Sequence, residues 1–149
     1  MLIEIGETSK IKYEGIFSVS KLNYYVDNEL RIYNSPYAIN STKNKVEMDS
    51  SDFEKYFNVN SSSEILSMQI LTHDVMDDLV NFYKEYNIDL EIVIKGNNIY
   101  IRFDTGAMFE PNILKKSTDM NTLWVYYKII KFITNFTNKT NKLIANLDI

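Results

Sequence analysis

The strongest constraint on the fold is a long helical pattern at the C-terminal end of the chain. From about Asp119 to Leu147, apolar side chains recur at helical spacing along one broad face. The opposite side of this helix carries a stripe of lysines. Two of these lysines interrupt the most apolar part of the helix, which argues against a membrane span. The stripe and its neighbouring tryptophan comprise Lys128, Lys131, Lys139, Lys142 and Trp124.

A second helix is predicted over His73–Tyr86, with Thr72 as its N-cap. Its apolar residues recur at helical spacing, which predicts one buried face. Most of its polar residues lie on the other side. The acidic residues there are Asp74, Asp77, Asp78 and Glu85.

Alternating residues over Leu90–Lys95 and Asn98–Asp104 predict a β-hairpin, because Gly96 and Asn97 between them accept positive φ. Upstream of the hairpin, the pattern predicts strands at 2–5, 11–20 and 29–33, with a turn at 26–29. A loop at 34–51 and short helical turns at 52–57 and 63–71 follow these strands. Downstream of the hairpin, residues 105–116 are predicted to form a connection. The expectation is a single α+β domain over residues 1–149. It has a small antiparallel sheet with the hairpin at 90–104, a helix at about 73–86 and a long amphipathic helix at about 119–147.

The composition excludes several classes of protein. With 149 residues, 45% hydrophobic and 24% charged, the chain is long and apolar enough to form one core. The absence of cysteine excludes disulfides and cysteine-ligated zinc. No run of eighteen apolar residues occurs, and an acid stands near the N-terminus where a signal peptide would be basic. The sequence therefore predicts a cytoplasmic protein.

Charge is unevenly distributed along the chain. Residues 47–91 carry a net charge of −9, whereas residues 110–149 carry +3. The overall charge of −4 argues against a generally basic nucleic-acid binder. We therefore expect two charged surfaces that could contact a partner: the acidic face of the 73–86 helix and the lysine stripe. Trp124 beside the stripe would be an interface anchor if exposed, although capping the core is the commoner role.

No catalytic motif is present. The four glycines, at positions 6, 15, 96 and 106, are too scattered for a phosphate-binding loop. The single histidine, His73, with Asp77 and Asp78 could ligate a metal for hydrolysis. The alternative is an exposed first-turn residue, flanked by acids that complement the helix dipole. We predict no catalytic residue, no cofactor, no metal and no small-molecule substrate.

Several motifs in the middle of the chain resemble an uncharacterised bacterial family with the signature F-E-K-x-F-x-V, A-R-Y-x-L-T-P-x-x-M and F-E-P. The matching residues are Phe53-Glu54-Lys55, Phe57, Val59, Ile70-Leu71-Thr72, Met76, Leu79, Ile99-Tyr100-Ile101, Phe109-Glu110-Pro111 and, upstream, Tyr13-Glu14-Gly15-Ile16-Phe17. The resemblance covers roughly residues 11–115 and implies the C-terminal soluble α+β part of proteins whose N-terminal helices span a membrane. This chain departs from the signature at Ser67-Met68-Gln69, which replaces A-R-Y, and at His73, which replaces the proline.

The favoured functional hypothesis is a non-enzymatic module that binds another macromolecule, most directly a protein, through its acidic face, its lysine stripe or both. Its size, its acidity and an amino-acid usage typical of AT-rich genomes, with many Asn, Ile, Lys and Tyr and few Ala and Arg, also fit a phage-borne inhibitor of a bacterial defence protein. The alternatives are a membrane-proximal domain whose basic helix lies near anionic lipid, and a metal-assisted hydrolase.

Overall fold

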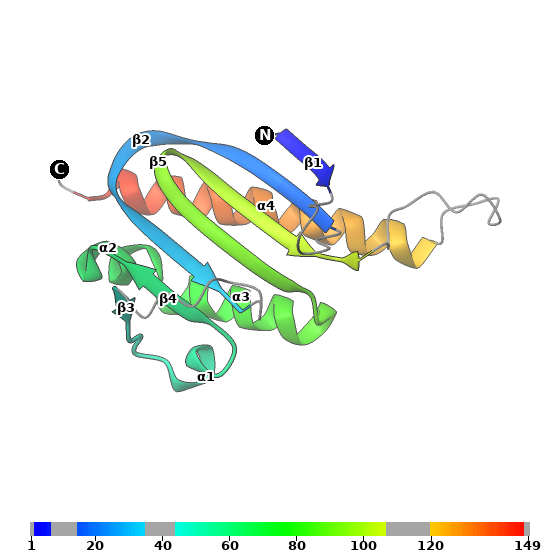
Figure 1. Cartoon of the computed structure of the whole chain (residues 1–149), viewed down its shortest axis with the longest axis horizontal. Helices are drawn as coiled ribbons and strands as arrows, with labels where there is room; N and C mark the ends of the chain where they lie inside the picture. The colour runs from blue at the N-terminus through cyan, green and yellow to red at the C-terminus, as the bar shows by residue number, and fades with distance from the viewer. Residues whose placement is uncertain (1, 7–14, 35–43, 107–119, 148–149) are drawn as a thin grey trace.

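The computed structural model describes residues 2–6, 15–34, 44–106 and 120–147 (Figure 1). Five strands and four helices are defined within these ranges. The strands are β1 (Leu2–Gly6), β2 (Gly15–Tyr33), β3 (Lys45–Val46), β4 (Asn58–Ser61) and β5 (Asp89–Asp104). The helices are α1 (Ser51–Glu54), α2 (Glu64–Ile70), α3 (His73–Tyr86) and α4 (Met120–Ala145).

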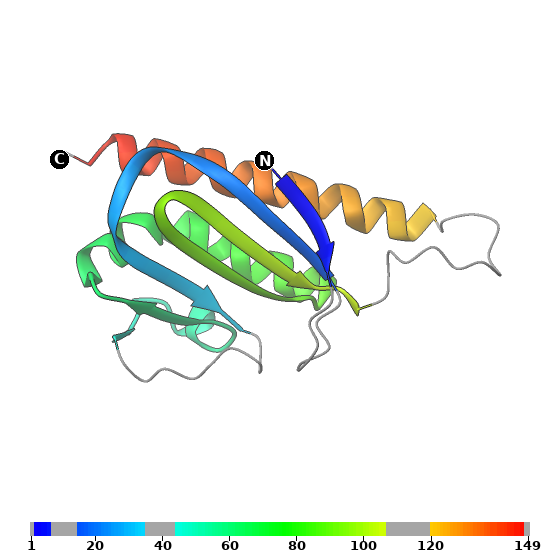
Figure 2. The same cartoon turned by 45° about the horizontal axis from the view of Figure 1, so that its top comes forward.

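The sheet is built on β5 nested inside an arch formed by β2 (Figures 1 and 2). β5 turns back on itself at Gly96, whose φ of +60° suits the first central position of a tight hairpin turn. The first part of β2 pairs with the second half of β5, and the end of β2 pairs with the first half, all antiparallel. Because β2 runs around the outside of the turn, it takes the ten residues Lys21–Leu30 to cover the distance that β5 covers with the five residues Ile94–Asn98.

Short strands extend the sheet at both ends of the arch. β1 pairs with the first residues of β2, β4 pairs with its last residues, and β3 pairs with β4, all antiparallel. The arch is fixed to α4 by Asn141, whose side-chain oxygen accepts a hydrogen bond from the backbone N–H of Asn23 at 2.8 Å.

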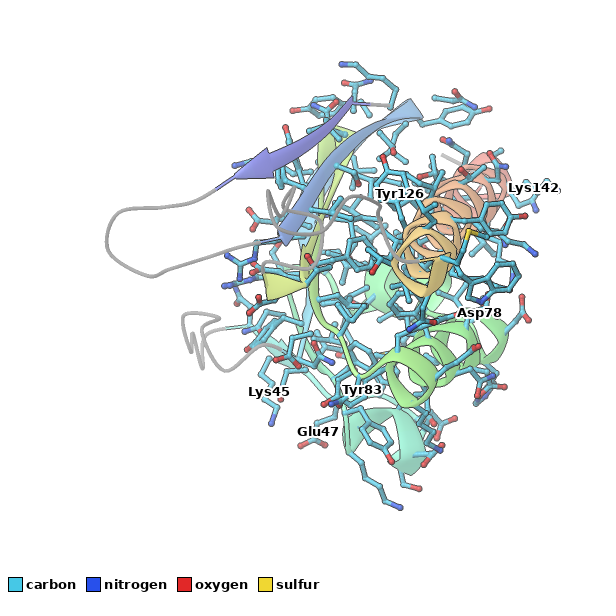
Figure 3. The ribbon with its side chains drawn as sticks, turned by 90° about the vertical axis from the view of Figure 1, so that its right-hand side faces the viewer. Lys45, Glu47, Asp78, Tyr83, Tyr126 and Lys142 are labelled. Carbon is cyan, nitrogen blue, oxygen red and sulfur yellow. The ribbon has the colours of Figure 1, made fainter. Side chains whose placement is uncertain are left out.

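Helices α3 and α4 cover one face of the sheet, as the end-on view in Figure 3 shows. That face is apolar because inward side chains alternate along β2 and β5. The core between the layers includes Leu30, Ile32, Ile92, Ile94, Ile99, Ile101 and Phe103 from the sheet, and Leu79, Val80, Ile129, Ile133 and Phe136 from the helices.

The other face of the sheet carries a polar cluster that contains both arginines of the chain. Arg31 Nε and an Arg102 guanidinium nitrogen each lie 2.8 Å from a different oxygen of the Glu91 carboxylate. Glu91 stands on β5 between the two arginines, and its side chain is mostly buried. The cluster therefore ties β2 to β5 across the open face.

The predicted α+β class, the hairpin and the two long helices are confirmed. α3 has the predicted bounds, and the Thr72 side chain accepts a hydrogen bond from the Val75 N–H at 3.4 Å. Residues 29–33 form a strand as predicted, but the predicted turn at 26–29 was wrong, because these residues belong to the continuous β2. β3 lies in the predicted loop, and β4 was not predicted. The connection at 105–116 and part of the strand at 11–20 lie largely outside the described residues.

Candidate functional site

Helices α3 and α4 lie side by side and run antiparallel. Lys139, late in α4, contacts the start of α3, where its Nζ lies 2.7 Å from an Asp74 carboxylate oxygen and 2.5 Å from one of Asp78. These hydrogen bonds, first that of Asp74 and then that of Asp78, raise the pKa of Lys139 above its usual range. Figure 3 places Asp78 between the two helices.

The acidic face and the lysine stripe are therefore joined rather than separate. Asp74 and Asp78 are partly neutralised by Lys139 and cannot present two full negative charges to a partner. Asp77 and Glu85 remain exposed on α3. The structure thus brings together residues from the two predicted surfaces, and it leaves the excess positive charge on α4.

A groove of about 360 Å³ separates the exposed sides of α3 and α4. Aromatic rings line its inner part: Phe82 of α3 lies 4.6 Å, centre to centre, from Phe132 of α4. Charged and amide side chains line the two walls. The lining comprises Asp78, Asn81, Phe82, Glu85 and Tyr86 from α3, and Lys128, Lys131, Phe132, Asn135, Phe136 and Lys139 from α4.

One residue in the groove, Tyr86, has a shifted acidity. Burial, and then the neighbouring Glu85 carboxylate, raise the pKa of the Tyr86 hydroxyl above its usual value of 10.0. A tyrosine hydroxyl is protonated at neutral pH with or without this shift, and here it stands beside Glu85 as a hydrogen-bond donor at this end of the groove.

The first two turns of α4 project beyond the strands, as both views of the whole fold show (Figures 1 and 2). Large apolar side chains are exposed there, including Met120 at 77%, Trp124 at 54% and Tyr127 at 52%. We call this region the α4 tip; it comprises Met120, Leu123, Trp124, Tyr126 and Tyr127. All the buried residues of α4 lie further along the helix, from Ile129 to Ile144.

Trp124 is therefore exposed and does not cap the core, although capping the core is the commoner role of a tryptophan at such a position. Its ring packs against the ring of Tyr127 at 5.7 Å. The Lys128 ammonium lies 4.7 Å from the centre of the Trp124 ring, a cation–π contact. Lys128 thus connects the α4 tip to the groove, while Lys131 lines the groove and Lys142 projects outward from α4 (Figure 3).

His73 is an exposed residue in the first turn of α3. Across residues 2–6, 15–34, 44–106 and 120–147, no group of three or more histidine, cysteine, aspartate or glutamate side chains is arranged to hold a metal ion. The described part of the structure therefore gives the hydrolase hypothesis no geometric support.

The sequence profile of a family described as "Protein of unknown function (DUF3137)" matches residues 11–142. The chain belongs to this family. No curated protein and no solved structure matches the chain. Within the described residues of this DUF3137 member, no helix has the length and apolar character needed to cross a membrane.

Sequence reasoning missed part of this site. Met120 and Tyr127 were not proposed as contact residues, although a helical projection places both outside the apolar arc of the C-terminal helix. That placement was the available signal for the α4 tip. Nothing in the sequence indicated the groove, because Phe82 and Phe132 come together only when α3 and α4 pack.

Proposed function

We propose that this protein is a non-enzymatic module that binds another macromolecule, and that its contact surface is the α4 tip with the adjacent Lys128 and Lys131. The observation that carries the proposal is the exposed Trp124–Tyr127 pair with Lys128 on the tryptophan ring. Tryptophan and tyrosine supply most of the energy in many protein interfaces, and soluble proteins rarely expose several together without a binding role.

Charge favours an acidic partner for this surface. Lys128 and Lys131 make no ion pair among the described residues, whereas Lys139 is held by two carboxylates. A second copy of the same surface would bring like charges together, which disfavours self-association through it. A protein with an apolar pocket surrounded by carboxylates would fit. A bacterial defence protein bound by a phage-borne inhibitor is one partner of this kind.

The test is an affinity pull-down from bacterial lysate with three forms of the chain. The wild type should retain one stoichiometric protein at low salt and lose it at high salt, because screening weakens the lysine contribution. Trp124→Ala/Tyr127→Ala should fail to retain it.

The matched control is Tyr24→Ala/Tyr25→Ala, which removes two exposed aromatics from the β2 arch. This variant should behave like the wild type. Equal retention by the α4-tip variant, or no retained protein at either salt concentration, would contradict the proposed contact surface.

An anionic membrane is the second candidate partner. The combination of tryptophan, tyrosine and lysine on one exposed helix end is also typical of helices that bind the membrane interface. Co-sedimentation with vesicles of phosphatidylglycerol and phosphatidylcholine at low salt tests it. Binding to the anionic vesicles alone, lost in Trp124→Ala/Tyr127→Ala, would favour this candidate over a protein partner.

A further inference from the structure

We propose that the groove between α3 and α4 binds a small organic phosphate, with the phosphate held by Lys128 and Lys131. The proposal shares Lys128 and Lys131 with the proposed macromolecular contact surface, but it requires only a small ligand inside the groove and not the exposed aromatic residues of the α4 tip. The shared chemistry is a phosphate ester on a hydroxyl-bearing group, which either a nucleoside monophosphate or the headgroup of an anionic lipid could supply.

The size and lining of the groove suit such a ligand. Its volume of about 360 Å³ lies within the range of small-molecule sites. Phe82 and Phe132 offer apolar and aromatic contact toward the core, and Phe82 is almost fully buried. Asn81 of α3 and Asn135 of α4 also line the groove, and their amides can both donate and accept hydrogen bonds.

The distribution of charge locates the phosphate. Lys139 already contacts two carboxylates, so its charge is largely compensated. Lys128 and Lys131 form no ion pair with any described residue, and they stand one helical turn apart on the same wall. Lysine ammonium groups bind phosphate as point charges, and a pair of them matches one phosphate group.

The opposite wall limits what can bind. Glu85, which forms no ion pair among the described residues, repels additional negative charge on the ligand, so a monophosphate should bind better than a triphosphate. Glu85 also accepts hydrogen bonds, which suits a ligand with hydroxyl or amino groups. These features predict a ligand with one phosphate at the α4 wall and a neutral, donor-bearing part near α3.

The experiment is a titration of the full chain with adenosine monophosphate, adenosine triphosphate, glycerol 3-phosphate and inorganic phosphate at low salt. Trp124 is the only tryptophan, and it contacts Lys128, so its fluorescence reports on the phosphate end of the groove. Amide chemical shifts in NMR spectra provide a second readout that does not depend on Trp124. We expect saturable shifts in α3 and α4, stronger for adenosine monophosphate than for adenosine triphosphate.

Lys128→Gln/Lys131→Gln should weaken the binding at least about tenfold, because two charge-assisted contacts are lost. Lys142→Gln removes an exposed lysine that does not line the groove, and it should leave the affinity unchanged. Circular dichroism of each variant checks that it is folded. Equal weakening by both variants would overturn the proposal, because general charge attraction would then suffice.

A further arm identifies the source of the phosphate. In the Trp124→Ala/Tyr127→Ala variant, which lacks the exposed aromatic pair of the α4 tip, vesicles of phosphatidylglycerol should compete with adenosine monophosphate in the NMR titration if the groove recognises a lipid headgroup. They should not compete if it recognises a soluble nucleotide. Absence of saturable shifts with the soluble phosphates and with the vesicles would overturn the proposal. That result would leave the pull-down test of the α4 tip unaffected.

Discussion

The two ends of α4 have the same kind of sequence but opposite environments. From Ile129 onward, one side of the helix is buried against the sheet, and Lys139 ties it to α3. At the α4 tip, aromatic and apolar residues of similar size remain exposed. The difference arises because the strands end before the helix does (Figure 1).

This comparison shows that hydrophobic character alone does not decide whether a residue belongs to the core. Ile133 and Trp124 are both large and apolar, but Ile133 is fully buried and Trp124 is more than half exposed. Exposed aromatics that have no stabilising role are expected to be retained for binding. We therefore expect stability to depend on the packed part of α4 and binding to depend on the α4 tip.

The largest effect is expected for Ile133→Ala, in the packed part of α4. Removal of a fully buried isoleucine side chain leaves a cavity and should lower the free energy of unfolding by about 3 kcal/mol. Urea denaturation followed by circular dichroism measures this. The control is Leu123→Ala at the α4 tip, which should change stability by less than about 0.5 kcal/mol. Comparable losses in both variants would refute the proposed division of the helix.

A smaller change, in the direction of higher stability, is expected for Thr140→Val. Thr140 is fully buried in α4, and its hydroxyl finds no hydrogen-bond partner among the described residues. Replacement by an isosteric methyl group should raise the free energy of unfolding by about 1 kcal/mol, because an unsatisfied polar group is removed from the core. Thr134→Val is the control, since the Thr134 hydroxyl is exposed and donates to the Ile130 carbonyl at 3.0 Å. A loss of stability in Thr140→Val would show that its hydroxyl is satisfied.

The smallest effect is expected for Lys139→Met, which breaks the link between α4 and α3. The ion pairs are partly exposed, so the loss should be below about 1 kcal/mol at neutral pH. Because the pKa of Lys139 is raised in the folded state, its contribution is present below the unfolded-state pKa and disappears as the pH rises through the folded-state value. Unfolding of both proteins, measured from neutral to strongly alkaline pH, should show the two stabilities converging. A constant difference would mean that the lysine acts through packing alone.

The sequence predicted the regular elements well where local signals agreed. The sequence predicts α3 from its N-cap, Thr72, and from the apolar spacing that follows. In the structure the helix ends at Asn87, which adopts the left-handed conformation common at helix C-termini. Gly96 similarly determines the position of the hairpin turn. The arch of β2 could not be predicted, because residues 21–29 follow the outside of that hairpin and adopt a strand conformation through pairing that is distant in sequence. The residues of the candidate site were found only in part, because the charges were visible but their pairing was not.

The sequence by itself determined the amphipathic helices, their charged faces and the hairpin, because each depends on residues within a few turns of one another. The tertiary structure decided which charges remain unpaired. It joined Lys139 to Asp74 and Asp78, and it left Lys128 and Lys131 without an ion pair among the described residues. It also left the α4 tip exposed, because burial depends on where the sheet ends, and the sequence of a helix carries no record of that edge.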